Sequence, residues 1–289
     1  MTTARPFIKI PGGKTQSLPE LRRRYPVKEA FSRYHEPFLG GGAVFFDLHA
    51  LGLLEGKECY LSDENDEIVN AFQAVRDHVE QLIKALAEHR DRHRADPARH
   101  FYGVRAEVPR GKVARAARII YLLKTCFNGL YRVNRSGKFN APMGRYENPT
   151  ICAEDNLRAC QAALEGVHVF REDFQDCGKR AGRGDFLYLD PPYLPASKTA
   201  NFTAYTRSKF GLPEHRRLAE MVGQLSLAGS LVLASAADSE VSRDLYRDFR
   251  IEAIAVRRNI SRNGRGRGKV GELVIVNSAL EERRCPPVN

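Results

Sequence analysis

A carboxylate followed by two prolines and an aromatic ring, Asp190-Pro191-Pro192-Tyr193, has residue types and spacing that could do chemistry. It follows a glycine turn signal and an apolar run at residues 186–189, which predicts one buried strand. Because proline lacks an amide hydrogen and has a fixed φ, the strand must end here, in extended backbone. Open α/β sheets bind ligands at such strand ends, so Asp190 is a candidate catalytic residue. An ordinary solvated turn is the alternative, and the tetrapeptide alone does not decide between the two.

Two earlier strand ends predict a nucleotide site. The sequence Glu-Pro-Phe-Leu-Gly-Gly-Gly at residues 36–42 runs into an apolar helix start, which is typical of a nucleotide-binding turn, although it could be a purely structural one. Asp63 ends the next expected strand, in the place of a carboxylate that binds ribose hydroxyls. The dinucleotide pattern G-x-G-x-x-G is absent. The two elements together therefore predict an adenosine-type ligand without a pyrophosphate, and S-adenosylmethionine fits that description.

Two shorter motifs could complete such a site. Gly12 and Gly13 let the backbone approach a ligand, with the Lys14 ammonium close by, although the spacing of a Walker loop is absent. Asp173 and Phe174 follow an expected strand at residues 167–170, where an acid and a ring suit hydrogen bonding and stacking to adenine. His215 lies in an expected charged helix at 213–224 and is assigned no role.

From residue 66 on, the pattern of apolar and charged residues changes. Apolar residues recur at helical spacing between residues 75 and 121, which predicts an inserted helical domain at 66–149. Residues 90–147 carry 14 Lys and Arg against 4 Asp and Glu, so most of the net charge of +11 lies there. Such a run can be no more than a solvated face, but this concentration favours a nucleic-acid partner.

The insertion ends in Phe-Asn-Gly-Leu-Tyr-Arg-Val-Asn-Arg-Ser-Gly-Lys-Phe-Asn at residues 127–140. The Ser-Gly pair predicts a β-hairpin. Aromatic, amide and guanidinium groups alternate along the run, and such groups can wedge between bases, read base edges and bind phosphates. A basic hairpin that binds phosphate without sequence preference is the alternative.

Composition narrows the class of protein. No apolar run is long enough to span a membrane, and residues 1–6 lack the apolar core of a signal peptide, so we expect a cytoplasmic protein. The six cysteines form no C-x-x-C pair, and no set of metal ligands is evident, so we expect reduced thiols and no metal.

Taken together, these motifs resemble the Dam-type DNA adenine-N6 methyltransferases. The resemblance runs from about residue 7 to residue 277 and is carried in order by F-I-K-I-P-G-G-K, E-P-F-L-G-G-G, L-S-D-E-N, F-N-G-L-Y-R-V-N, G-K-F-N-A-P-M-G-R-Y, D-P-P-Y, T-A-N-F-T-A-Y and R-R-N-I-S-R-N-G. It implies an α/β fold with a Rossmann-like, mostly parallel sheet of seven strands and helices on both sides. Residues 1–65 and 150–289 would form the catalytic domain, and residues 66–149 the inserted DNA-recognition domain.

The resemblance also implies roles for individual residues. The S-adenosylmethionine pocket would be lined by Ile10, Lys14, Phe38, Gly40, Asp63, Asp173 and Asp190. The tetrapeptide at 190–193 would hold a target adenine flipped out of double-stranded DNA, within GATC as we predict. The DNA contacts would be made by Lys9, Phe127, Asn128, Leu130, Arg132 and Arg145. Two places depart from the family's common pattern, because Ile10 stands where Trp is usual and Ala236-Ala237 where Asn-His is usual.

Other functions remain open at this point. Methyltransferases of RNA or of a glutamine amide more often carry Asn in place of Asp190, and they lack this insertion. A catalytically silent DNA-binding protein is the second rival, and the intact D-P-P-Y sequence disfavours it. The enzyme could be a solitary monomer or the modification half of a restriction system acting at another short adenine-containing site.

Overall fold

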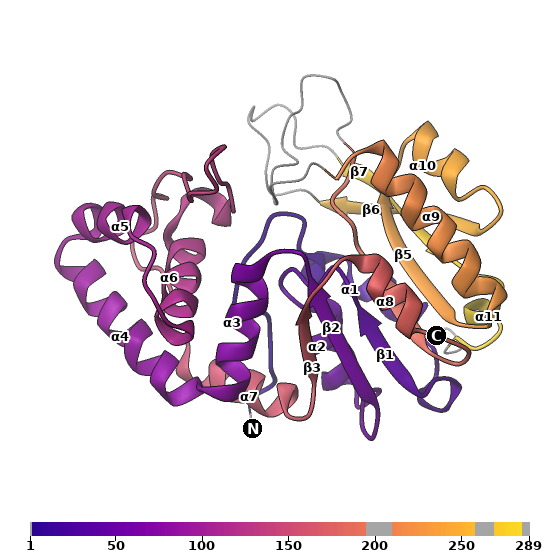
Figure 1. Ribbon diagram of the computed structural model, residues 1–289, viewed down its shortest axis with the longest axis horizontal. Coiled ribbons are helices and arrows are strands. Elements are labelled where there is room, and N and C mark those ends of the chain that lie inside the picture. Colours follow the sequence, from indigo (N-terminus) through magenta and orange to yellow (C-terminus); the bar gives the residue numbers. More distant parts are fainter. Residues whose placement is uncertain (1, 195–209, 258–268, 285–289) are drawn as a thin grey trace.

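The computed structural model describes residues 2–194, 210–257 and 269–284, and within these ranges seven strands form one mixed sheet (Figure 1). The strands are β1 (Arg33–Glu36), β2 (Glu58–Asp63), β3 (His168–Arg171), β4 (Phe186–Leu189), β5 (Leu231–Ala237), β6 (Arg250–Arg257) and β7 (Lys269–Val276). Their order across the sheet is β3-β2-β1-β4-β5-β7-β6, with β7 antiparallel to both of its neighbours and the other pairings parallel. The expected α/β fold with a seven-stranded, mostly parallel sheet is confirmed.

Helices surround this sheet. They are η1 (Lys14–Gln16), α1 (Leu18–Arg22), η2 (Lys28–Ala30), α2 (Ala43–Ala50), α3 (Asp66–Asp77), α4 (Val79–Ala95), α5 (Pro97–Ala106), α6 (Lys112–Thr125), η3 (Phe127–Gly129), α7 (Glu154–Leu164), α8 (Phe174–Arg180), α9 (Leu212–Leu227), α10 (Glu240–Leu245) and α11 (Ser278–Glu281). Among the helices that the structure describes, none is both long and apolar enough to cross a membrane.

The sheet separates two hydrophobic cores, because successive side chains of a strand point to opposite faces. On β4, Phe186 and Tyr188 belong to the larger core, together with residues of α2, α3 and α6. Leu187 and Leu189 alternate with them and pack with α8, α9 and Tyr246 in the smaller core. All four residues of β4 are buried, which explains the unbroken apolar run in the sequence.

The chain reverses its direction of travel across the sheet at β1, which pairs with β2 on one side and with β4 on the other. Helices and loops leaving two such neighbouring strands diverge, so a crevice is expected at their carboxyl ends. The loops that follow β1, β2, β3 and β4 begin at that edge, and they carry the glycine-rich turn, Asp63, Asp173 and Asp190.

The segment between β2 and β3 forms the helical lobe beside the sheet in Figure 1, with α4, α5 and α6 in purple and magenta. Helix α3 lies between the lobe and the sheet, because it contacts α6 as well as α7 and β3. The predicted β-hairpin is confirmed, since Val133 and Phe139 pair in antiparallel fashion and the Asn140 amide donates to the Arg132 carbonyl at 2.9 Å. Residues 195–209 and 258–268, which include the T-A-N-F-T-A-Y motif and most of the R-R-N-I-S-R-N-G motif, lie outside the described residues.

Candidate active site

Asp190 directly follows β4, and its carboxylate contacts Lys14, a lysine near the amino terminus of the chain. The Lys14 Nζ atom lies 2.8 Å from Asp190 Oδ1, and it donates a hydrogen bond to the Tyr193 hydroxyl at 2.7 Å. The same ammonium lies 4.6 Å from the centre of the Tyr193 ring and 3.3 Å from Oε1 of Glu272 on β7. The structure thus joins Lys14, Asp190 and Tyr193 in one cluster, and it adds Glu272, which sequence reasoning missed.

Two opposing effects set the protonation of Asp190. Burial raises the pKa of its carboxyl to about 6, and the nearby Glu272 carboxylate adds to this, while Lys14 opposes both. At pH 7 the carboxyl group is therefore ionised, and it remains basic enough to take up a proton. A hydrogen-bond acceptor with these properties at a sheet edge is suited to general base chemistry.

The carbonyl of Pro192, the second proline after Asp190, is fixed by a histidine. His215 on α9 is buried, and its Nε2 lies 3.1 Å from the Pro192 carbonyl oxygen while Pro191 is buried beside it. Because a carbonyl can only accept, the proton of the imidazole must be on Nε2. His215 was assigned no role from the sequence, since its partner is a backbone atom 23 residues away and no pattern reveals that contact.

The glycine-rich turn after β1 is tied to the end of β2. Asp63 accepts hydrogen bonds from the Gly40 and Asn65 amides, both at 2.9 Å. Burial nevertheless raises the pKa of Asp63 to about 6, against the lowering effect of these two bonds. Gly42 has φ of 66°, and a Cβ there would lie 3.0 Å from the Phe72 ring, so a glycine is required where the turn enters α2.

Aromatic rings line the neighbouring part of the edge. Phe38 stacks on Phe174 with ring centres 5.5 Å apart, and Phe210 meets Phe38 edge-on at 5.6 Å. Asp173 caps α8 by accepting from the Gln175 amide at 2.9 Å and forms an ion pair with a nearby arginine of α9. An acid beside stacked rings can accept from an adenine amine while the rings contact its face.

Lys9 lies next to the loop at residues 127–130, although the two are far apart in the sequence. Gly129 has φ of 65°, and a Cβ there would lie 3.0 Å from the Lys9 carbonyl oxygen. Phe127 is 51% exposed, and Asn128 adopts a left-handed conformation with φ of 54°. Ile10 and Leu130 are half-buried against the larger core. The predicted cofactor residue Ile10 therefore lies beside predicted DNA-contacting residues, namely Lys9, Phe127, Asn128 and Leu130. Arg132, also predicted to contact DNA, follows further along the hairpin.

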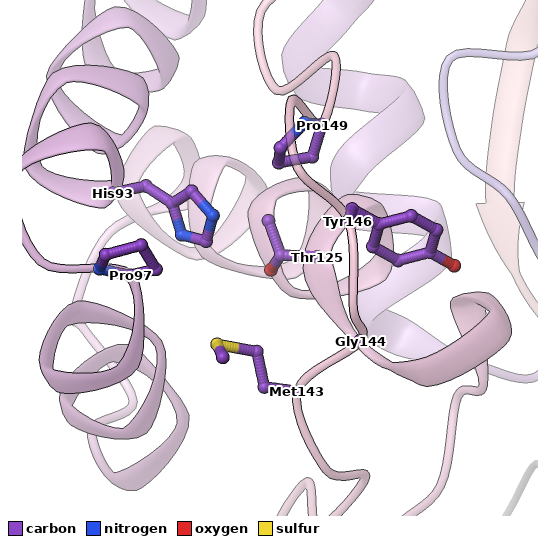
Figure 2. A pocket seen from close by; sticks show the side chains of 7 residues that line it. All are labelled: His93, Pro97, Thr125, Met143, Gly144, Tyr146 and Pro149. Atoms are coloured by element: carbon purple, nitrogen blue, oxygen red, sulfur yellow. The ribbon is translucent and has the colours of Figure 1, made fainter.

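The loop at residues 127–130 and the end of α6 before it are held by hydrogen bonds to residues 142–144, which begin the closing segment of the helical lobe between β2 and β3. The Phe127 amide donates to the Pro142 carbonyl at 2.9 Å, and the Gly144 amide donates to the Thr125 carbonyl at 2.8 Å. Figure 2 shows the small cavity at this junction, about 20 Å³, where Tyr146 lies next to Gly144. A Cβ at Gly144 would overlap the Tyr146 ring. The cavity has room for about one water molecule, so we take it as part of the support of the loop and not as a ligand site.

The two predicted arginines differ in their surroundings. Both are exposed, and Arg132 lies along the hairpin, with Nε donating to Asn140 Oδ1 at 2.7 Å and Nη2 to the Asn140 carbonyl at 2.9 Å. Arg145 is on the closing segment.

Among the described residues, no group of three or more His, Cys, Asp or Glu is arranged to hold a metal ion.

Glu36, at the end of β1, is a buried carboxyl next to this site. Its Oε2 accepts from the Tyr34 hydroxyl at 2.7 Å and from the Phe45 amide at 3.1 Å. Burial is the largest effect on this group, and the pKa of Glu36 rises to about 8. Glu36 is therefore mostly protonated at pH 7, in contrast to Asp190.

We expect the replacement Glu36→Gln to remove a pH dependence of stability. A carboxyl whose pKa rises from 4.5 to about 8 on folding gives stability that is complete below pH 4.5 and is lost as the pH rises through 8. The wild type should therefore lose roughly 2–4 kcal/mol relative to Glu36→Gln between pH 5 and pH 8. Urea unfolding of both proteins at the two pH values measures this difference, and parallel pH profiles would show that Glu36 ionises without cost.

Comparison with known proteins shows the family to which the chain belongs. Residues 11–260 match the family described as D12 class N6 adenine-specific DNA methyltransferase. The chain is 36% identical over 281 residues to the type II methyltransferase M1.LlaDCHI of Lactococcus lactis subsp. cremoris, covering 94% of this chain and 95% of that one. It is 37% identical over 287 residues to the type II methyltransferase M.MjaIII of Methanocaldococcus jannaschii, with 94% and 99% covered. A DNA adenine methylase of Serratia marcescens is 34% identical over 278 residues, with 95% and 98% covered.

The mixed seven-stranded α/β fold is consistent with a methyltransferase, and the family match over most of the chain specifies the class. The protein belongs to the D12 class of N6 adenine-specific DNA methyltransferases. The predicted family and enzyme class are thereby confirmed. Membership implies DNA as the substrate and S-adenosylmethionine as the methyl donor.

Proposed function

We propose that this enzyme methylates adenine within GATC in double-stranded DNA, after flipping the base into a site formed by Asp190, Pro191, Pro192 and Tyr193. The observation that carries the proposal is the position of Asp190. It is an ionised acceptor at the carboxyl end of β4, at the point where the strand order reverses, and it is paired with the buried Lys14. The insertion supplies the groups that suit recognition of a duplex.

The chemistry requires two acceptors for the two hydrogens of the adenine amine, whose lone pair is delocalised into the ring. The Asp190 carboxylate would accept one hydrogen, and the Pro191 carbonyl the other. His215 binds the next carbonyl, that of Pro192, and so restrains the backbone that presents the Pro191 carbonyl. Tyr193 would stack on the flipped base, a contact that contributes about 1–3 kcal/mol. S-adenosylmethionine supplies a methyl group on an activated leaving group, so positioning can provide much of the acceleration.

The donor set of the strand-end loops fits an adenosine-type cofactor. Asp63 is the candidate partner for ribose hydroxyls, and its bond to the Gly40 amide places it beside the glycine turn. Phe38 and Asp173 would contact the adenine ring of the cofactor. Ile10 and Lys14 would close the pocket from the amino-terminal segment. Asp190 would lie between the cofactor and the target base.

The DNA would be read by the inserted region, residues 66–149, together with Lys9, while residues 1–65 and 150–289 carry out catalysis. Phe127 is half-exposed on a left-handed turn and is suited to wedge into the base stack. Asn128 and Leu130 flank it on the same loop. Unstacking a base costs a few kcal/mol, and a rigid wedge offsets part of that cost. A monomer can methylate a palindromic site one strand at a time, so we propose a monomeric, cytoplasmic enzyme.

GATC is proposed because an arginine and a lysine can each reach the O6 and N7 acceptors of guanine. Arg132 would read the guanine of one strand, and Lys9 the guanine next to the target adenine. The experiment is single-molecule sequencing of DNA from a methylation-deficient host that expresses this chain. We expect modified adenines within GATC. Modification at another short adenine-containing site would refute GATC as the recognition sequence but not the enzyme class, and it would favour a modification enzyme of a restriction system. Two relatives carry the name type II methyltransferase.

Arg132→Ala and Arg145→Ala should weaken DNA binding by the enzyme in different ways. Arg132→Ala removes a base contact, so discrimination at one base pair should fall by about 1–3 kcal/mol. Arg145→Ala removes a phosphate contact, so all sequences should bind less tightly and the salt dependence should become less steep. Binding is measured with GATC duplexes and single-base substitutions at two salt concentrations. Equal losses on every duplex for Arg132→Ala would reassign that residue to the DNA backbone.

A further inference from the structure

A second buried carboxylate reaches the catalytic cluster from the antiparallel part of the sheet. Glu272 lies on β7, opposite Ala237 of β5, and is 7% exposed. Its Oε1 lies 3.3 Å from the Lys14 Nζ atom. This oxygen is buried and accepts no hydrogen bond from the described residues, although it is close enough to Lys14 for a charge interaction. Glu272 is thus held in the site by the charge of Lys14 and by an interaction with the Tyr193 hydroxyl, while its Oε1 atom has no hydrogen-bond partner among the described residues.

The charges of this cluster do not cancel. Lys14 contributes one positive charge, while Asp190 and Glu272 contribute two negative charges. The Glu36 carboxyl also senses the charge of Asp190, but its pKa of about 8 leaves it mostly neutral at pH 7. Burial and the neighbouring carboxylates raise the pKa of the Tyr193 hydroxyl, so it is neutral as well. Among the residues that the structure describes, one buried negative charge of this cluster remains without a partner, which is costly unless a cation offsets it.

We propose that Glu272 determines specificity for the charged form of the cofactor, favouring S-adenosylmethionine over S-adenosylhomocysteine. This inference rests on the proposed function, in which the methyl group faces the adenine amine at Asp190 and the sulfur therefore lies near the cluster. Transfer breaks the S–CH₃ bond, forms the N–CH₃ bond and releases one amine proton to a base. The sulfur thereby changes from a sulfonium cation to an uncharged thioether. The attraction to the cluster ends with the reaction, which favours exchange of product for new donor.

The expected effect follows from Coulomb's law. A unit charge about 8–10 Å from a sulfonium, at an effective dielectric constant near 20, changes affinity by about 15- to 30-fold. The replacement Glu272→Gln isolates this charge, because glutamine has nearly the same shape and its side-chain oxygen still faces Lys14. A purely structural role of Glu272 would affect both ligands alike, since they differ only in the methyl group and the charge on sulfur.

Calorimetric titration of the full chain with S-adenosylmethionine and with S-adenosylhomocysteine tests the proposal without any turnover. For Glu272→Gln we expect Kd for the donor to rise about 15- to 30-fold, with little change for the product. Glu272→Asp retains the charge and should keep the wild-type ratio of the two constants. Lys14→Gln makes the cluster more negative, so the ratio should shift in the opposite direction, toward the donor. The matched control is Glu252→Gln, because Glu252 pairs with Arg24, outside the Lys14 cluster, and its loss should leave the ratio unchanged.

Equal changes of both dissociation constants in Glu272→Gln, or no change in either, would overturn the proposal. If Glu272→Gln does not fold, the Lys14→Gln shift decides, and an unchanged ratio there would also overturn it. Failure of the proposed role of Asp190 gives a different result, since Asp190→Ala would then transfer methyl groups to DNA at near the wild-type rate.

Discussion

Replacing Asp190 by alanine is expected to reduce single-turnover methyl transfer to DNA by on the order of 10³-fold or more. The carboxylate is the acceptor that holds the amine of the flipped adenine, and at pH 7 it is ionised despite a pKa raised to about 6. DNA binding should remain near the wild-type level, because the hairpin and the loop at residues 127–130 lie on another part of the chain. Rapid-quench methylation and DNA titration measure the two effects separately.

Asp190→Asn is the matched control for this experiment. It keeps the shape and one acceptor oxygen, so the Lys14 contact can persist, but it removes the charge. We expect a rate between those of the wild type and Asp190→Ala. The wild-type rate should fall as the pH drops through about 6, where the carboxyl gains a proton, and Asp190→Asn should lose that dependence. Near wild-type transfer by Asp190→Ala would refute the assignment.

Replacing Asp63 by alanine is expected to weaken S-adenosylmethionine binding by tenfold or more, since a charge-assisted hydrogen bond contributes about 1.5–3 kcal/mol. The loss has two sources. A ribose hydroxyl pair loses its acceptor, and the Gly40 and Asn65 amides lose the oxygens that position the glycine turn. Calorimetric titration measures the dissociation constant, with thermal unfolding as a check on the fold.

Asp63→Asn separates these two sources, because asparagine keeps one oxygen for the turn but not the negative charge. An intermediate dissociation constant is expected. Since the pKa of Asp63 is raised to about 6, wild-type affinity should also fall as the pH drops through that value, and Asp63→Asn should not show this change. An unchanged affinity in Asp63→Ala would place the ribose contact elsewhere.

Local signals were sufficient for most of the elements that carry the site. The expected strand before Asp190 is β4, and the acid after the second strand is Asp63, because a buried parallel strand must be apolar and prolines must end it. The hairpin at Val133 and Phe139 follows in the same way from its turn residues. Such features depend on neighbours within a few residues, so the sequence alone contains their cause.

The partners across the sheet were decided by tertiary structure. Lys14 precedes the first strand of the chain, and Glu272 belongs to its last strand, β7. They meet at Asp190 because β4 and β5 lie at the centre of the sheet and β7 runs antiparallel beside β5. The hydrogen bond from His215 to the Pro192 carbonyl has a backbone acceptor, which no residue pattern specifies. The sequence by itself determined the strand-end acids, the glycine turn and the hairpin. Their pKa values and their pairing depend on burial and on charges far along the chain, which exist only once the sheet has formed.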